Sequence, residues 1–297
     1  MGSINYLGPK GTFTEEALSN FITHKSEFLQ ETLETDLTNC TEYVPAVSIN
    51  AAIDALLKEQ VQFTFVPIEN SLGGTVMATL DYLSTNGDIE ICAEVVLPIR
   101  HHLWTYPDAQ SVDDITHVYS HPQALYQCQY FLLTHMPLAE EVEFPSTANA
   151  AAYVHEKRNL HYAAIGGPML GGMYELKALC ENIEDVHNNM TRFILIRKHK
   201  FVDLCDVDIQ NKTSIVFEVD GLRPGSLYES LAIFAKRQIN LVRIESRPTK
   251  GRLGEYKFFF DLDSTDDAEN MRAALTELKN LASTFTLLGS YNVWEVK

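Results

Sequence analysis

The chain lacks the basic surface and the long hydrophobic runs that nucleic-acid-binding and membrane proteins carry. Its 297 residues hold 23 Lys and Arg against 40 Asp and Glu, a formal net charge of -17 at pH 7. A negative surplus of this size argues against nucleic acid and anionic membranes as partners. No apolar run approaches the roughly 18 residues of a membrane-spanning helix, and no secretory signal precedes Tyr6. We therefore expect no nucleic-acid and no membrane partner.

Cysteine pairs and metal-ligand spacings are missing as well. The five cysteines are widely separated, odd in number and without a Cys-x-x-Cys pair. This pattern favours reduced thiols in a cytoplasmic protein over a disulfide framework. No His, Asp or Glu group stands at metal-ligand spacing, so we expect no metal.

Positive charge is scarcest in the first two thirds of the chain. Residues 1–200 contain 11 Lys and Arg against 25 Asp and Glu. An anionic ligand bound there must depend on a few placed groups, because no general positive field is available. Solubility alone accounts for most of the acidic residues. A length of 297 residues fits about two domains.

What the chain contains is an alternation of short apolar strands with amphipathic helices over residues 1–200, an α/β pattern. In such folds, ligands bind at the loops that follow strand C-termini. The predicted strands are residues 4–7, 61–67, 89–97, 117–119, 162–165 and 193–196, and the predicted helices are 12–22, 122–133 and 146–155.

After residue 200 the predicted order becomes βαββαβ, which is ferredoxin-like. The strands are residues 213–219, 240–247, 255–262 and 285–289, and the helices are 225–237 and 266–281. The polar stretch 202–212 is the expected linker, so the chain divides into domains 1–200 and 201–297.

Polar clusters stand where predicted strands meet helices. Gly8-Pro9-Lys10-Gly11-Thr12 precedes a helix whose free N–H groups and dipole favour an anion, with the charge of Lys10 added. Thr12 and Glu15 form a capping box. The segment matches neither a Walker A loop nor a dinucleotide fingerprint, and a tight turn is the plain alternative.

Two further clusters follow other strands. In Pro67-Ile68-Glu69-Asn70-Ser71 the glutamate offers proton transfer and its neighbours offer hydrogen bonds, although a helix N-cap explains Asn70 or Ser71 equally well. Ser120-His121-Pro122-Gln123 is followed by Gln127, four residues after Gln123 and on the same helix face. His121 fits a helix start better than a catalytic base. Ser146 opens a fourth such helix.

Thr191 and Arg192 stand at the mouth of the apolar run 193–196. A guanidinium binds a planar carboxylate through two hydrogen bonds, and a hydroxyl donates one more. This pair suits a carboxylate-bearing substrate, whereas a strand start with two solvated residues is the alternative.

In this order, the clusters resemble the prephenate dehydratase family over almost the whole chain. The family motifs Gly-Pro-x-Gly-Thr-Phe, Pro-Ile-Glu-Asn-Ser, Ser-His-Pro-Gln-Ala-Leu-x-Gln-Cys and Thr-Arg-Phe stand at residues 8–13, 67–71, 120–128 and 191–193. One departure follows Ser71, where Gly73-Gly74 occupies a stretch in which the family usually has Glu before Gly.

The C-terminal unit resembles an ACT domain, the amino-acid-sensing module of this family. The residues that match its two phenylalanine-site motifs are Gly225, Ser226 and Leu227, with Ser in place of Ala, and Glu245, Ser246, Arg247 and Pro248. The resemblance implies that L-phenylalanine binds between these segments of two chains, in a homodimer or homotetramer.

For the catalytic region, the resemblance implies two α/β lobes like those of type II periplasmic binding proteins. They correspond to about residues 1–98 plus 182–200, and to 99–181. No chorismate mutase segment precedes the first strand, so a monofunctional lyase of L-phenylalanine biosynthesis is expected, under allosteric control by L-phenylalanine.

The implied reaction converts prephenate into phenylpyruvate, water and carbon dioxide without a cofactor. Thr191 is the family's catalytic threonine, which we interpret as a hydrogen-bond donor to the leaving oxygen, with Glu69 as a proton relay. The residues expected to bind substrate are Thr12, Asn70, Ser71, Ser120, Gln127 and Arg192. A structural role for Arg192 is equally open. Arogenate dehydratase and a non-enzymatic amino-acid sensor are the alternative functions.

Overall fold

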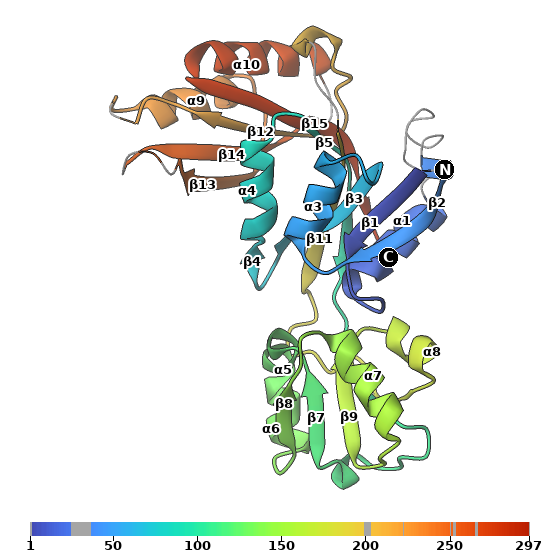
Figure 1. Ribbon diagram of the computed structural model, residues 1–297. Helices are drawn as coiled ribbons and strands as arrows, with labels where there is room; N and C mark the ends of the chain where they lie inside the picture. Colours follow the sequence, from blue (N-terminus) through green and yellow to red (C-terminus); the bar gives the residue numbers. More distant parts are fainter. Residues whose placement is uncertain are drawn as a thin grey trace.

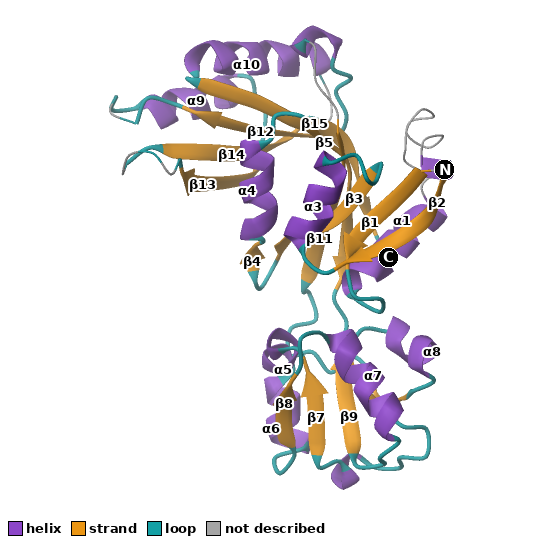
Figure 2. Cartoon of the chain, in the orientation of Figure 1, coloured by secondary structure: helices purple, strands orange, loops and turns teal. Residues whose placement is uncertain are grey.

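The computed structural model describes residues 2–24, 37–198, 203–221, 223–249, 251, 254–264 and 267–296. Its strands form two sheets, one of ten strands and one of five, with helices packed on their faces (Figure 1). Figure 2 shows the smaller sheet set apart from the larger one and joined to it by two connecting segments. The expected boundary between residues 200 and 201 lies outside the described residues.

In the part that the structure describes, the first lobe contains one half of the larger sheet with helices α1, α3 and α4. Its elements are β1 (Gly2–Leu7), α1 (Phe13–His24), β2 (Cys40–Ala46), α3 (Ile49–Leu57), β3 (Phe63–Asn70), β4 (Gly74–Thr75), α4 (Met77–Thr85), β5 (Ile89–Pro98) and β11 (Met190–Lys198). Their order is β5-β11-β3-β1-β2, in which β11 runs antiparallel to both neighbours. The predicted apolar run 193–196 is therefore buried at the centre of this half.

The second lobe is the five-stranded sheet. Its elements are β6 (His102–Thr105), β7 (His117–Ser120), α5 (Pro122–Gln127), α6 (Gln129–His135), β8 (Glu140–Glu143), α7 (Thr147–Lys157), β9 (Tyr162–Gly166), α8 (Met169–Tyr174) and β10 (Lys177–Cys180). Helices α5 and α6 pack on one face and α7 and α8 on the other. The chain enters this lobe after β5 and leaves it before β11, which gives the expected two-lobed architecture (Figure 1).

The C-terminal unit has the predicted βαββαβ order. Its elements are β12 (Lys212–Glu218), α9 (Ser226–Lys236), β13 (Leu241–Pro248), β14 (Tyr256–Asp263), α10 (Ala268–Leu281) and β15 (Thr284–Glu295). The strands pair antiparallel in the order β13-β14-β12-β15. Residues of both helices join the aromatic side chains of the sheet in one buried cluster. The predicted ferredoxin-like fold is confirmed.

Strand β15 is longer than predicted and joins the two halves of the large sheet. The prediction ended at residue 289, but residues 292–295 pair in parallel with residues 93–96 of β5. Trp294 packs against the core of the first lobe and stacks on His24 at 5.2 Å between ring centroids. The predicted strand ended at Gly289, but β15 continues through this residue. The glycine is needed there because a Cβ would collide with the carbonyl of Ile91.

Two other expectations need correction. The predicted helix 122–133 is broken at Cys128, which ends α5 and precedes α6. The elements that the sequence pattern missed are β2, α3, β4, α4, β6, β8, α8 and β10. Each of these is shorter than ten residues, so its periodicity is too brief to stand out.

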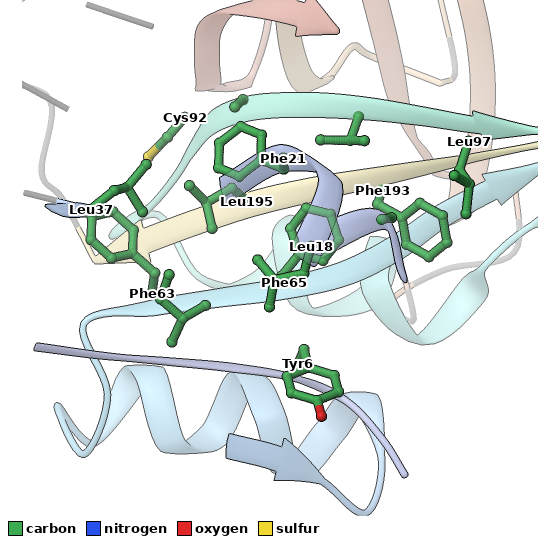
Figure 3. Packing of buried hydrophobic residues seen from close by; sticks show 14 of the residues in the cluster. Tyr6, Leu18, Phe21, Leu37, Phe63, Phe65, Cys92, Leu97, Phe193 and Leu195 are labelled. Carbon is green, nitrogen blue, oxygen red and sulfur yellow. The ribbon is translucent and has the colours of Figure 1, made fainter. Parts of the chain in front are cut away.

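The aromatic core of the first lobe reaches the cleft through Phe193. Figure 3 shows Tyr6, Phe21, Phe65 and Phe193 packed together from β1, α1, β3 and β11. Phe65 stacks on Phe193 with ring centroids 5.6 Å apart. Because Phe193 also lines the cleft, this core fixes the end of β11 on which Thr191 stands.

Candidate active site

A cleft of about 760 Å³ lies between the two lobes. The first lobe lines it with Leu7, Gly8, Pro9, Thr12, Phe13, Thr14, Pro45, Ala46, Val47, Pro67, Asn70, Val76, Thr191 and Phe193. The crossover and the second lobe contribute Ile99, His101, His121, Gln123, Ala124, Gln127, Pro145, Ser146, Thr147 and Asn149. Four of the predicted site residues are thus brought together here: Thr12, Asn70, Gln127 and Thr191.

The charge of this cleft is unusual for the expected dianion. Among its described lining residues there is no Lys, Arg, Asp or Glu, and the only ionisable side chains are those of His101 and His121. Lys10 is exposed and does not line the cleft, contrary to its expected contribution. An anion bound here must therefore rely on neutral hydrogen-bond donors and helix N-termini.

Two of the helices that begin at the cleft wall, α1 and α7, are capped by a side-chain hydroxyl. Thr12 Oγ1 accepts a hydrogen bond from Glu15 N at 3.4 Å before α1, and Ser146 Oγ accepts one from Asn149 N at 3.0 Å before α7. The remaining first-turn N–H groups of each helix have no acceptor within the helix. With the helix dipole, they form a suitable binding region for carboxylates.

Glu15 holds the loop before α1 in a way that differs from the predicted capping box. Its Oε2 accepts from Gly11 N at 2.5 Å, one residue before the expected partner, and its Oε1 accepts from Tyr6 Oη at 2.8 Å. Burial, followed by this bond to Glu15, raises the pKa of Tyr6, so its phenol stays protonated as the donor. The carboxylate thus serves the loop and does not face the cleft.

Thr191 is buried at the cleft wall with its hydroxyl oxygen already engaged. Asn70 Nδ2 donates to Thr191 Oγ1 at 2.8 Å. Asn70 Oδ1 accepts from Leu72 N at 3.1 Å and Gly73 N at 2.7 Å, which fixes the orientation of the amide. Since the Thr191 oxygen accepts, its own proton is left to donate into the cleft.

A second layer of amides and hydroxyls holds this pair in place. Asn189 Oδ1 accepts from Asn70 Nδ2 at 2.8 Å and from Ser71 Oγ at 3.2 Å. Ser71 Oγ in turn accepts from Met190 N at 3.0 Å. Ser71 therefore ties the turn after β3 to the start of β11. It was expected to bind substrate, but it does not line the cleft. Asn189 was not predicted as a site residue.

Glu69 and Arg192 lie on the opposite face of the sheet from the cleft. Neighbouring strand residues point to opposite faces, so Asn70 and Thr191 face the cleft while Glu69 and Arg192 face away. The Arg192 guanidinium contacts three carboxylates: Glu69 at 2.6 Å, Glu94 at 2.7 Å and Asp261 at 2.6 Å. This geometry does not fit the expected relay from Glu69, nor substrate binding by Arg192; it fits the structural alternative.

The Arg192 cluster joins the first lobe to the C-terminal unit. Lys212 Nζ lies 2.6 Å from Glu94 Oε1, and Ser214 Oγ donates to Asp261 Oδ1 at 2.6 Å. Burial raises the pKa of Asp261, but Arg192 and the Ser214 hydroxyl outweigh it, so the pKa is lowered. Asp261 is therefore an ionised carboxylate paired across the two units.

The second-lobe cluster is only partly at the cleft. Ser120 is fully buried, and its Oγ donates to Ile165 O at 2.7 Å, so the expected substrate contact does not fit. His121 caps α5 by accepting from Gln123 N at 3.2 Å, as the sequence favoured. A Cβ on Gly73 would lie 2.9 Å from Nε2 of the exposed Gln123, so a side chain at this position would require the flexible Gln123 amide to shift.

Comparison with known proteins decides the family. The prephenate dehydratase profile matches residues 4–201.

The chain belongs to the prephenate dehydratase family.

The ACT domain profile matches residues 214–280. A prephenate dehydratase of Methanocaldococcus jannaschii is 38% identical over 99% of this chain and 99% of its own length, and one of Bacillus subtilis is 32% identical with the same coverage. These matches confirm the predicted enzyme class, a carbon–oxygen lyase of the prephenate dehydratase type.

Solved structures agree. The prephenate dehydratase of Arthrobacter aurescens in complex with L-Phe is 33% identical, with a TM-score of 0.80 over 98% of this chain and 90% of that chain. The Staphylococcus aureus prephenate dehydratase is 28% identical, with a TM-score of 0.79 over 98% of this chain and 100% of that chain. The predicted fold class is confirmed.

In the ACT domain, β13 presents its two faces to different surroundings. Glu245 Oε2 accepts from Thr75 Oγ1 of the first lobe at 2.8 Å, and Arg247 lies 3.1 Å from Asp81. The alternate residue Ser246 is exposed, as is Pro248. Strand β13, which carries the motif residues 245–248, therefore contacts the catalytic region of this prephenate dehydratase family member through one face only.

The companion segment begins α9. Gly225 has a φ of +86°, Ser226 is buried and Leu227 packs against the ACT core. In the described part of one chain, no hydrogen bond or ion pair joins this segment to residues 245–248. Among the described residues, no group of three or more His, Cys, Asp or Glu side chains is placed so that it could hold a metal ion. None of the described helices has the length and apolar character needed to span a membrane.

Proposed function

We propose that this chain catalyses the decarboxylating dehydration of prephenate to phenylpyruvate in the cleft between its lobes. The bond from the ring to its carboxylate breaks, and its electron pair completes the aromatic ring. The ring carbon–oxygen bond breaks on the other side, and the departing hydroxide takes up one proton. The products are phenylpyruvate, carbon dioxide and water.

The observation that carries this proposal is the uncommitted proton of Thr191 at the cleft wall. Asn70 occupies the hydroxyl oxygen at 2.8 Å, so Thr191 can donate to the leaving oxygen. A hydroxyl is too weak an acid to lose its proton outright near pH 7, so Thr191 stabilises the developing charge. The hydroxide takes up its proton from the bulk solution after it leaves, because no carboxylate lines the described cleft wall.

The substrate carboxylates are held by neutral donors. The N-termini of α1 and α7 line the cleft from opposite lobes, and Gln127, which is bonded to His101 of the crossover, lines it as well. A dianion bound by such dipoles is positioned without a counter-ion that would neutralise the carboxylate due to leave.

The cleft lining favours prephenate over arogenate. Arogenate carries an ammonium group where prephenate carries a keto group, and a buried ammonium needs an anionic partner. Since no Asp or Glu belongs to the described lining, the keto acid fits better.

We also infer allosteric regulation by L-phenylalanine within L-phenylalanine biosynthesis. Supporting this, one face of the motif strand β13 contacts the first lobe through Glu245 and Arg247, while Ser246 on its other face is exposed. Among the described strands, β13 pairs only with β14, so a second chain can cover its other edge and complete the effector site. We propose that the protein forms a homodimer or homotetramer. We further propose that residues 1–200 form the catalytic domain and residues 201–297 the regulatory domain. The two lobes of the catalytic domain would then be residues 1–98 plus 182–200, and residues 99–181. A cytoplasmic location stays a prediction from the cysteines.

One assay tests the proposal. Purified protein is incubated with prephenate or with arogenate, with and without L-phenylalanine, and phenylpyruvate or phenylalanine is measured. We expect turnover of prephenate that EDTA does not reduce, and a shift in its KM with L-phenylalanine. Binding of L-phenylalanine with no turnover of either substrate would establish the amino-acid sensor instead.

A further inference from the structure

The crossover between β5 and β6 carries a buried imidazole at the cleft wall. His101 is 2% exposed and lines the cleft. Its backbone N donates to Glu184 Oε2 at 2.9 Å, and its carbonyl accepts from Ile183 N at 2.8 Å. Both partners belong to the segment that returns to the first lobe. The two crossovers therefore fix the position of this ring between the lobes.

The ring makes one described hydrogen bond. His101 Nε2 lies 2.9 Å from Gln127 Oε1, whereas His101 Nδ1 is buried and has no hydrogen-bond partner. Phe13 packs edge-to-face against the ring, with centroids 5.3 Å apart at an interplanar angle of 85°. Gln127 is the only polar side chain to which this imidazole is bonded among the described residues.

The surroundings select one tautomer. Burial lowers the pKa of His101 and outweighs the opposing effects of Gln127 and Glu184, with His102 also lowering it, so the ring is neutral near pH 7. A proton on Nδ1 would be buried without an acceptor, which costs more than leaving a lone pair unpaired. The proton therefore sits on Nε2 and is donated to the amide oxygen of Gln127.

This bond decides what Gln127 offers to a ligand. With Oε1 held by His101, the amide NH₂ group is the part left for the cleft. If the amide turned over, its oxygen would face the cleft and repel a carboxylate. Because no Lys or Arg belongs to the described lining, each correctly turned N–H donor counts for anion binding.

We propose that His101 is a positioning residue that holds the Gln127 side chain with its NH₂ group toward the anionic substrate. This inference rests on the proposed function, because it assumes an anion in this cleft. The motif residue Gln127 was predicted from its cluster; His101, which lies in no motif considered above, was not.

The test compares full-length variants by prephenate turnover and, separately, by calorimetric binding of prephenate. Replacing His101 with Leu should raise both KM and Kd about tenfold, as expected for one misdirected hydrogen bond to a charged ligand. The change in kcat should be much smaller. Replacing His101 with Gln restores a donor to Oε1 and should recover most of the affinity.

A double variant separates positioning from a general structural effect. If His101 acts through Gln127, then His101→Leu added to Gln127→Leu should weaken binding no further than Gln127→Leu alone. His102→Leu is the matched control: its buried ring bonds Asn182 N at 2.9 Å and lies outside the cleft lining, so prephenate affinity should persist.

Three results overturn the inference: a Kd for His101→Leu within twofold of wild type, additive losses in the double variant, or an equal loss in the His102→Leu control. Binding is measured apart from turnover, so failures are distinguishable. If the wild-type chain binds prephenate without converting it, the proposed function is wrong. The binding constants of the variants would still test the role of His101.

Discussion

At the scale of single residues, catalysis is expected to depend on the hydroxyl of Thr191. Replacing Thr191 with Ala removes the donor to the leaving oxygen and should lower kcat by roughly 10²–10⁴. KM should change little, because the bond strengthens as negative charge develops in the transition state. Thr191→Ser should retain part of the activity. Steady-state kinetics on variants with wild-type melting temperature check this, and an unchanged kcat in the folded Ala variant would remove Thr191 from the mechanism.

Glu16 should make the protein less stable as the pH rises. It is partly buried on α1, and burial raises its pKa from 4.5 to about 7. Between these values the folded protein holds a proton that the unfolded chain has lost, so the free energy of unfolding falls with increasing pH. Glu16→Gln should flatten this dependence. Urea denaturation at pH 5 and pH 8 measures it.

The exposed Glu156 on α7 provides the control. Glu156→Gln should keep the wild-type difference between the two pH values. If Glu16→Gln also kept it, the pH dependence would have another source.

The sequence motifs placed the strand residues of the site near one another, but they did not show which face of the sheet each side chain occupies. Asn70 and Glu69 are neighbours in one motif, as are Thr191 and Arg192, and each pair was interpreted as acting together. Strand alternation puts only one of each pair in the cleft. His101 escaped prediction because its role depends on a contact with Gln127, 26 positions away.

At the scale of elements, the first half of β11 is held by the ion pairs of Arg192 on one face and by the packing of Phe193 on the other. Replacing Arg192 with Met leaves Glu94 and Asp261 buried without their shared cation. We expect a loss of about 3–5 kcal/mol in the free energy of unfolding. KM for prephenate in the folded variant should stay close to wild type, since Arg192 does not line the cleft.

Arg223 offers a matched surface pair with Glu229, in which both side chains are nearly half exposed. Arg223→Met should cost about 0–1 kcal/mol. A large rise in KM with little loss of stability in Arg192→Met would return Arg192 to substrate binding.

Strand β15 crosses from the ACT unit into the first lobe at Gly289. A Cβ there would collide with the Ile91 carbonyl, so Gly289→Ala must push β15 and β5 apart. We expect destabilisation of about 1–3 kcal/mol by urea denaturation. Gly172→Ala in α8, where a Cβ meets no atom within 4 Å, should be close to neutral. Equal stabilities of the two variants would show that the strands yield at no cost.

At the scale of the whole molecule, the sequence predicted the parts better than their connections. The α/β alternation and the βαββαβ order are local patterns, and both are confirmed. The pairing of residues 292–295 with 93–96 is a contact between distant segments, and no periodicity indicates which strands become neighbours. A chain cut after residue 200 would lose this strand, so regulation is better tested with point variants in the complete chain.

The link between effector site and cleft is expected to pass through Thr75. Its hydroxyl donates to Glu245 of β13 at 2.8 Å and accepts from Arg243 at 3.0 Å. Thr75 stands on β4, which pairs with β3 at Glu69 and Asn70, and Asn70 holds Thr191. A change in β13 on binding L-phenylalanine can thus reach the catalytic hydroxyl through packed, hydrogen-bonded elements.

Replacing Thr75 with Val should therefore reduce the coupling between L-phenylalanine and prephenate, which is about 1–3 kcal/mol in typical allosteric proteins. Affinity for L-phenylalanine, measured by calorimetry, and kcat without effector should persist.

Ser246→Ala should do the reverse, weakening L-phenylalanine binding while leaving catalysis intact. Gly225 is unsuitable for this test, because its φ of +86° would strain any replacement. Since coupling is reciprocal, prephenate must change L-phenylalanine affinity by the same factor that L-phenylalanine changes prephenate affinity. A full L-phenylalanine response in Thr75→Val would place the coupling outside the contact between β4 and β13.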